Sequence, residues 1–201
     1  MYQSPINISS SDNIGIEQKI TIHGKNRGTT YNSDAKIFEI NDSIILEIDS
    51  KKYELDEYHF HIPGEHRIDK QKYDAEIHYV FIELGKGKGK TEKINNIKHH
   101  NVCGCNGDTI IPNENILVIS KFINFSHHCT HNDVSMLQVK IPRKYFEYDG
   151  SLTTGSFAPV RWIIGKNHIE FNQNEIINKA KTARKLQKLD GRIILYSKNI
   201  E

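Results

Sequence analysis

Short stretches in which apolar and polar residues alternate are the dominant pattern of this chain. They are rich in isoleucine, tyrosine and phenylalanine, and polar turns such as Asn41-Asp42-Ser43 separate them. Alternation with a period of two is typical of β-strands that bury one face. The pattern predicts strands at residues 19–23, 36–40, 44–48, 57–62, 75–83, 116–123 and 192–196.

One segment near the end of the chain shows helical spacing instead. Its apolar positions recur every three to four residues, at Ile176, Ile177, Ala180 and Ala183. Asn172 or Asn174 can cap the start of such a helix, and Gly191 can close it. We therefore predict a helix over residues 174–188 within a mainly β protein of the α+β class.

Length and charge exclude several classes of protein. A chain of 201 residues fits a single domain over residues 1–201. Lys and Arg number 27 against 25 Asp and Glu, a net charge of +2, which argues against a nucleic-acid partner. There is no run of 18 apolar residues to span a membrane. The first residues lack the build of a signal peptide, so we expect a cytoplasmic protein, or a virion-associated one if the source is viral.

Residues 85–115 and 124–135 are expected to be variable loops. In the first, residues 85–90 alternate glycine and lysine. The glycines keep high chain entropy and the lysines repel one another, which predicts a solvated loop. A phosphate-binding role is less favoured because the spacing is not that of a P-loop.

These two loops also contain every cysteine of the chain. Three cysteines cannot all pair within one chain, which fits a reducing compartment. Cys103, Cys105, Cys129 and His131, with further histidines beside them, could hold a second, structural zinc ion. They could equally form a disulfide between Cys129 and Cys103 or Cys105, or be plain polar loops. Their spacing matches no standard zinc finger.

Histidines on two neighbouring strands form the strongest chemical signal. On a strand, Glu57, His59 and His61 share one face, and Glu76 and His78 share a face of the next strand. If the two strands pair antiparallel, three imidazoles converge, and three neutral imidazoles with an open fourth position are the ligand set of a catalytic zinc site. The alternative is two ordinary strands whose histidines alternate by chance.

Two carboxylates support the zinc interpretation. Glu57 and Glu76 stand two residues before His59 and His78, where each can accept the second ring N–H of a liganding histidine and fix its tautomer. A cupin is a further alternative, because His59-x-His61-x-x-x-Glu65 fits the opening of that motif. Lys72, however, stands where a cupin requires glycine.

At this point the chain resembles the α-class carbonic anhydrases. The family's metal-binding signature is similar to Tyr58-His59-Phe60-His61-Ile62, Gly64-Glu65-His66 and Ala75-Glu76-Ile77-His78. The resemblance extends to Gln3-Ser4-Pro5-Ile6-Asn7-Ile8, to residues 148–154 with Trp162, and to Arg184, Gln187, Gly191 and Arg192. It covers most of residues 3–196.

The resemblance implies a fold and a reaction. The fold would be a twisted, mostly antiparallel central sheet with short peripheral helices, and the reaction would be the reversible hydration of carbon dioxide to bicarbonate and a proton. Zn²⁺ held by His59, His61 and His78 would lower the pKa of a bound water to about 7. Thr153 would accept a hydrogen bond from the zinc-bound hydroxide, and Glu65 would accept the proton of the Thr153 hydroxyl.

Further positions follow from the same resemblance. His66 would have a structural role, contacting the residues around the metal ligands and not the metal itself. The apolar side of the pocket, where carbon dioxide rests, would be lined by Val80, Val118, Leu152, Thr154 and Trp162.

The chain departs from the family at three places near this site. Glu57 stands where the family usually has glutamine, and Gly155-Ser156 replaces a Pro-Pro pair, which favours a more mobile pocket floor. Asp34 stands where fast members carry a proton-shuttle histidine. An aspartate is too acidic to relay protons for a group that titrates near pH 7. We therefore predict a slower enzyme, limited by proton transfer and accelerated by imidazole buffer.

A catalytically weak or inactive binding module is the remaining alternative. Some relatives, including poxvirus envelope proteins that bind glycosaminoglycan, keep the fold and lose liganding histidines. Here the three histidines, Thr153 and Glu65 are all present, which favours the enzyme. A basic groove would favour the binding module, and the dispersed lysines do not indicate one.

Overall fold

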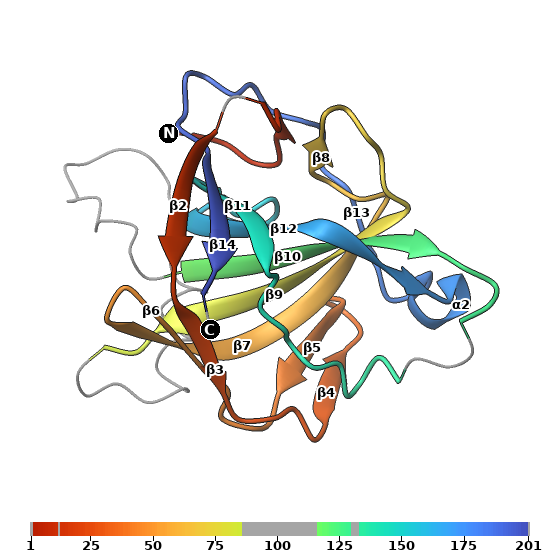
Figure 1. Ribbon diagram of the computed structural model, residues 1–201. Coiled ribbons are helices and arrows are strands. Elements are labelled where there is room, and N and C mark those ends of the chain that lie inside the picture. The colour runs from red at the N-terminus through yellow and green to blue at the C-terminus, as the bar shows by residue number, and fades with distance from the viewer. Residues whose placement is uncertain (1, 12, 86–115, 130–132, 201) are drawn as a thin grey trace, which may run out of the picture.

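A computed structural model describes residues 2–11, 13–85, 116–129 and 133–200. Twelve strands form one large twisted sheet, and β1 (Asn7–Ile8) and β8 (Arg67–Ile68) form a separate parallel pair (Figure 1). The strands of the large sheet are β2 (Ile14–Gln18), β3 (Ile20–His23), β4 (Thr29–Asn32), β5 (Ile37–Ile40), β6 (Ile45–Ile48), β7 (Lys51–Ile62), β9 (Ala75–Glu83), β10 (Ile116–Phe125), β11 (Lys144–Ser151), β12 (Pro159–Phe171), β13 (Lys181–Thr182) and β14 (Leu195–Asn199).

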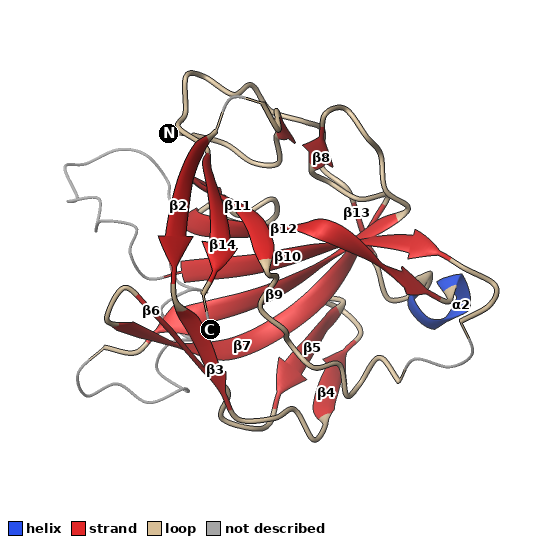
Figure 2. Ribbon diagram, in the orientation of Figure 1, coloured by secondary structure: helices blue, strands red, loops and turns tan. Residues whose placement is uncertain are grey.

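The sheet is mixed but mostly antiparallel. Its main path runs β2-β14-β11-β12-β10-β9-β7-β5-β4, and β6 and β13 also pair with β7. Parallel pairing occurs between β10 and β12, β14 and β2, and β13 and β7, and the remaining pairs are antiparallel. Figure 2 shows how little of the described chain is helical. The predicted mainly β fold with a twisted, mostly antiparallel sheet is confirmed.

Alternation along the long strands separates the buried side chains into two clusters. One cluster contains Leu55, Tyr58 and Phe60 of β7, which face one side of the sheet. The other contains Val80 and Val118, which face the opposite side. Because side chains on a strand alternate between faces, the histidines of β7 and β9 lie on the Val80 side.

The predicted strands at residues 19–23, 36–40, 44–48 and 75–83 are confirmed to within one residue at each end. Strand β7 begins earlier than the predicted 57–62, and β10 runs two residues beyond the predicted 116–123. The last strand, predicted at 192–196, is β14 at Leu195–Asn199. The turn before it is fixed by Arg192, whose guanidinium donates to the carbonyls of Leu189 and Lys188.

The predicted helix over residues 174–188 is wrong. Within this segment only α2 (Gln173–Ile176) is helical, capped by Asn172, one of the two predicted caps. Beyond α2, backbone N–H groups donate to carbonyls that are far away in the sequence: Ala183 N–H donates to Ile62 O, and Gln187 N–H donates to Pro5 O. Tertiary pairing with β7 and with the N-terminal segment therefore overrides the local helical spacing.

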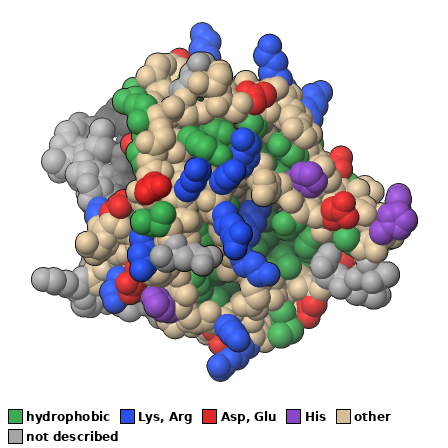
Figure 3. Space-filling view, in the orientation of Figure 1, with side chains coloured by type: hydrophobic (Ala, Val, Ile, Leu, Met, Phe, Trp, Pro, Cys, Tyr) green, Lys and Arg blue, Asp and Glu red, His purple; other side chains and the backbone are tan. Residues whose placement is uncertain are grey.

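Lysines that are far apart in the sequence meet on the surface. Lys144 of β11 and Lys198 of β14 are exposed and directly opposite each other. Figure 3 shows Lys and Arg side chains gathered over these two strands.

In the described part of the chain, no helix is long and apolar enough to cross a membrane.

Candidate metal centre

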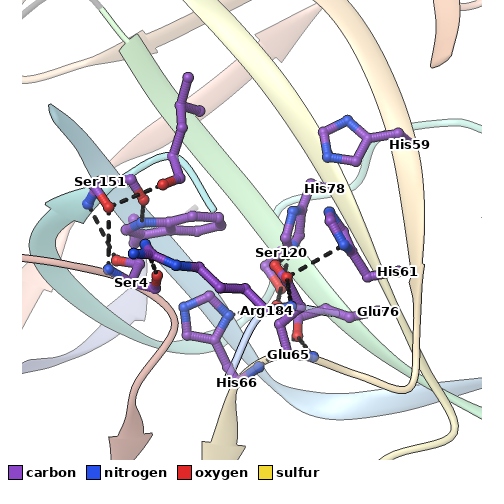
Figure 4. A network of polar contacts seen from close by, with 12 residues as sticks. Ser4, His59, His61, Glu65, His66, Glu76, His78, Ser120, Ser151 and Arg184 are labelled. Atoms are coloured by element: carbon purple, nitrogen blue, oxygen red, sulfur yellow. Dashed lines mark hydrogen bonds and ion pairs between the residues drawn. The ribbon is translucent and has the colours of Figure 1, made fainter. Parts of the chain in front are cut away.

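The antiparallel pairing of β7 with β9 brings three histidines together. His59 lies opposite His78, and His61 follows on the same face of β7. The ring centroids are 5.0 Å apart for His59 and His61, 5.3 Å for His59 and His78, and 4.7 Å for His61 and His78. One nitrogen from each ring can be chosen so that all three lie within 4.8 Å of one another. All three side chains are buried, and Figure 4 shows their rings gathered together.

Two carboxylates orient two of these imidazoles. Nδ1 of His59 lies 3.1 Å from Oε1 of Glu57, and Nε2 of His78 lies 2.9 Å from Oε1 of Glu76. With those nitrogens bound, Nε2 of His59 and Nδ1 of His78 are left for a metal ion. A carboxylate behind a histidine fixes its tautomer and strengthens it as a ligand.

Glu76 is fully buried and accepts hydrogen bonds from four residues. Its Oε1 accepts from His66 Nδ1 at 2.7 Å, from His78 and from the Ser120 hydroxyl. Its Oε2 accepts the backbone N–H groups of Glu65 and His66, each at 2.8 Å. Burial acts to raise the pKa of Glu76, but His66 and His78 outweigh it and hold that pKa well below its ordinary value.

His61 provides the test of whether the cluster fits a metal ion. Its ring is fully buried, yet neither nitrogen makes a hydrogen bond; Nδ1 lies 3.3 Å from Oε1 of Glu65 without hydrogen-bond geometry. A buried polar nitrogen without a partner is costly. Burial, with neighbouring charge, holds the pKa values of His59 and His61 well below ordinary, so both are neutral near pH 7. Neutral, convergent imidazoles are the ligands that Zn²⁺ takes, and the residues fit that ion.

Glu65 and Thr153 lie beside the histidines. Glu65 is buried, and its Oε1 accepts the backbone N–H of Arg184 at 2.7 Å. Burial raises the pKa of Glu65, and a contribution from the Thr153 side chain as donor acts in the opposite direction. Oε2 of Glu65 is buried and makes no hydrogen bond, so it is available to the Thr153 hydroxyl. Thr153 itself is buried.

Three of the predicted pocket residues lie on the strands beside His78. Val80, Val118 and Trp162 are buried and in register across β9, β10 and β12. The Trp162 ring lies 4.9 Å from the His78 ring. Leu152 and Thr154 are half-buried in the segment that follows β11.

Three contributors to the centre were not predicted from the sequence. Ser120 donates to Glu76, and Tyr148 Oη lies 2.6 Å from Nε2 of His66. The backbone of Arg184 holds Glu65. The sequence does indicate Ser120, because this polar residue interrupts the apolar run 116–123 on the face that carries Val118. The other two lie in segments that the resemblance covers, residues 148–154 and Arg184, but the motifs alone gave neither residue a role at the centre.

The sequence profile of the family described as eukaryotic-type carbonic anhydrase matches residues 1–198. The chain belongs to this carbonic anhydrase family. No curated protein sequence matches the chain.

Solved structures agree with the carbonic anhydrase fold. An α-carbonic anhydrase from Thermovibrio ammonificans, solved with sulfanilamide, is 20% identical with a TM-score of 0.66, covering 96% of this chain and 86% of that one. One from Photobacterium profundum is 20% identical with a TM-score of 0.67, covering 96% and 88%. Dioscorin, solved with ascorbate, is 16% identical with a TM-score of 0.67, covering 100% and 87%. At such identities the matches show the fold alone.

The cysteine-rich loops lie mostly outside this description. Cys103, Cys105 and His131 are outside the described residues, and so is most of the predicted loop 85–115. Cys129 is half-buried, and its thiol forms no disulfide with any described residue. The second zinc site and the disulfide therefore stay predictions.

Proposed function

We propose that this protein is a zinc-dependent carbonic anhydrase that reversibly hydrates carbon dioxide to bicarbonate and a proton. The observation that supports it most is the buried cluster of His59, His61 and His78, two of them held by carboxylates. When bound there, Zn²⁺ supplies a Lewis acid that makes hydroxide available near neutral pH.

Thr153 and Glu65 would orient the nucleophile. If the Thr153 hydroxyl donates to Glu65, its oxygen is left to accept a hydrogen bond from the water that reacts. The backbone N–H of Arg184 holds Glu65 in place at 2.7 Å. A fixed donor and acceptor pair of this kind lowers the entropy cost of the reaction.

The apolar wall beside His78 would receive carbon dioxide. Val80, Val118 and Trp162 present buried apolar surface, which suits a small uncharged substrate. Neither a fixed charge nor a strong donor is needed to hold such a molecule, because burial of apolar surface supplies the attraction.

The test compares His61→Ala with His168→Ala, a matched control at an exposed histidine of β12. Metal content by mass spectrometry and carbon dioxide hydration by stopped flow are measured on the same samples. We expect about one zinc per chain and hydration in the wild type and the control, and loss of both in His61→Ala. Zinc without hydration in the wild type would contradict the enzyme and favour the binding module.

A further inference from the structure

The turn between β11 and β12 contains an aromatic residue in a strained backbone conformation. The turn is closed by the Leu152 N–H, which donates to Ala158 O at 2.7 Å. Within it, Gly155 and Phe157 have positive φ angles of 68° and 53°. Glycine adopts such an angle freely, whereas a bulky residue keeps it only where the surrounding contacts impose it. Phe157 therefore needs a contact that holds it in place.

The side chain of Arg184 makes such a contact. Its guanidinium carbon Cζ lies over the Phe157 ring, 4.2 Å from the ring centre, which is within the range of a cation–π interaction. Phe157 is 37% exposed and Arg184 is half-buried. The charge and the ring are therefore partly withdrawn from water, which strengthens their attraction.

The same guanidinium also reaches the start of the turn. Arg184 Nη1 donates to Ser4 O at 2.8 Å, and Figure 4 shows the Arg184 side chain running from beside Glu65 to Ser4. Ser4 is paired in turn with Ser151, the last residue of β11. The Ser4 N–H donates to Ser151 Oγ at 3.1 Å, and the Ser151 N–H donates to Ser4 Oγ at 3.2 Å. Arg184 thus holds one end of the turn directly and the other through Ser4.

The backbone of Arg184 holds the expected partner of Thr153. Its N–H donates to Glu65 Oε1 at 2.7 Å, while Oε2 of Glu65 is buried without a hydrogen bond. In the proposed function, Oε2 accepts the Thr153 hydroxyl. One residue therefore fixes both this acceptor and the turn that carries its donor. Their relative position decides where the Thr153 oxygen points, and a small displacement of such a group is costly to the rate.

We propose that the contact of Phe157 with Arg184 is a clamp that positions Thr153 against Glu65. Phe157 and Arg184 are positioning residues, since they act through Thr153 and not on the substrate. Gly155-Ser156 leaves the turn without proline, and the clamp supplies the rigidity that a proline would give. This inference rests on the proposed function of Thr153.

The first test follows hydrogen exchange of the 152–158 amides in zinc-free protein by mass spectrometry. Phe157→Leu keeps an apolar side chain and removes the ring, so exchange in the turn should become roughly two- to fivefold faster. Phe157→Tyr keeps the ring and should exchange like the wild type. Met136→Leu is the matched control, because Met136 is 46% exposed and lies outside the turn, and it should leave exchange in the turn unchanged.

A double-variant cycle shows whether the effect passes through Arg184. Arg184→Gln removes the guanidinium and leaves the backbone N–H that holds Glu65. In this background, Phe157→Leu should accelerate exchange little further, because its partner is already missing.

The second test measures steady-state kinetics on zinc-loaded protein. Zinc content should be the same in Phe157→Leu and the wild type. The specificity constant kcat/KM should fall roughly three- to tenfold, because the attack on carbon dioxide depends on the aim of Thr153. Since proton transfer is predicted to limit turnover, kcat should change less, and Phe157→Tyr should restore kcat/KM.

Equal exchange in the wild type and Phe157→Leu, or effects that add fully in the double variant, would overturn the clamp. A looser turn with unchanged kcat/KM would overturn its role in positioning Thr153. If the wild type hydrates no carbon dioxide, the proposed function fails, and hydrogen exchange still decides whether the clamp exists.

Discussion

At the residue scale, the orientation of the histidine rings depends on the residues that hydrogen-bond to them. Glu76 accepts from His66, His78 and Ser120 and from two backbone N–H groups, so one carboxylate fixes both a candidate ligand and the turn after β7. His66 is in turn held by Tyr148. A buried network in which most donors are satisfied favours one arrangement of the rings.

Proton transfer is testable at Asp34. This residue is exposed in the turn between β4 and β5, where the Asn32 side chain accepts the Ala35 N–H. Because an aspartate relays protons poorly near pH 7, imidazole buffer should accelerate hydration by the wild type. Asp34→His should raise turnover, roughly tenfold or more, and reduce the effect of imidazole. Glu170→His, at an exposed site of β12, is the control, and equal gains in both variants would contradict the role of position 34.

Gly150 is a position where only glycine fits. A Cβ there would lie 2.2 Å from Ser4 Oγ and 2.7 Å from Cε2 of Tyr148. Gly150→Ala should therefore cost roughly 1–3 kcal/mol of unfolding free energy. Gly15→Ala, where nothing lies within 4 Å, is the matched control and should be near neutral. Denaturant unfolding of both variants makes the comparison, and equal stability of the two would contradict it.

At the element scale, β11 and β12 are joined to the turn after β6 by an ion-pair network that runs from buried Glu147 through half-buried Arg161 to exposed Asp49. Arg161 donates to Glu147 Oε1 from Nε at 2.8 Å, and its Nη1 lies 2.7 Å from Asp49 Oδ2. Burial raises the pKa of Glu147 despite this partner. Burial acts to raise that of Asp49 too, but hydrogen bonds from Arg161 and Gln18 hold it below ordinary.

Removing Arg161 should therefore have a pH-dependent cost. Near pH 7, Arg161→Gln should lower the free energy of unfolding by roughly 3 kcal/mol, because it leaves the Glu147 carboxylate unpaired. As the pH falls through the raised pKa of Glu147, that carboxyl takes up a proton and the cost shrinks. The contribution of Asp49 is present above its unfolded pKa and is lost as pH falls through its lower folded value. The measurement is the free energy of unfolding of the wild type and the variant between about pH 7 and pH 4, with Arg27→Gln, at an exposed arginine, as the control. A difference between wild type and Arg161→Gln that stays constant over this range would contradict the prediction.

Local alternation was sufficient to predict the elements that carry the cluster. The period of two placed His59, His61 and His78 on faces that meet, and the antiparallel pairing of β7 with β9 is confirmed. The same reasoning failed for residues 174–188, where the spacing of Ile176 and Ala180 suits a helix but the N–H groups bind remote partners.

At the scale of the whole molecule, a net charge of +2 conceals a local separation of charge. Lysines of β11 and β14 face each other on the surface, while carboxylates lie beside the buried histidines. Topology decides this arrangement, since the sheet joins strands that are far apart in the sequence. Composition argued against a dedicated nucleic-acid binder, but it could not locate either group of charges.

On the proposed function, one zinc ion in the histidine cluster makes this protein a carbonic anhydrase. The most direct measurement is a titration of zinc into metal-free protein, with carbon dioxide hydration followed by stopped flow at each addition. Hydration should rise in proportion to zinc and level off at about one ion per chain, because the three imidazoles form a single site. Zinc that binds at this ratio without producing hydration would contradict the claim.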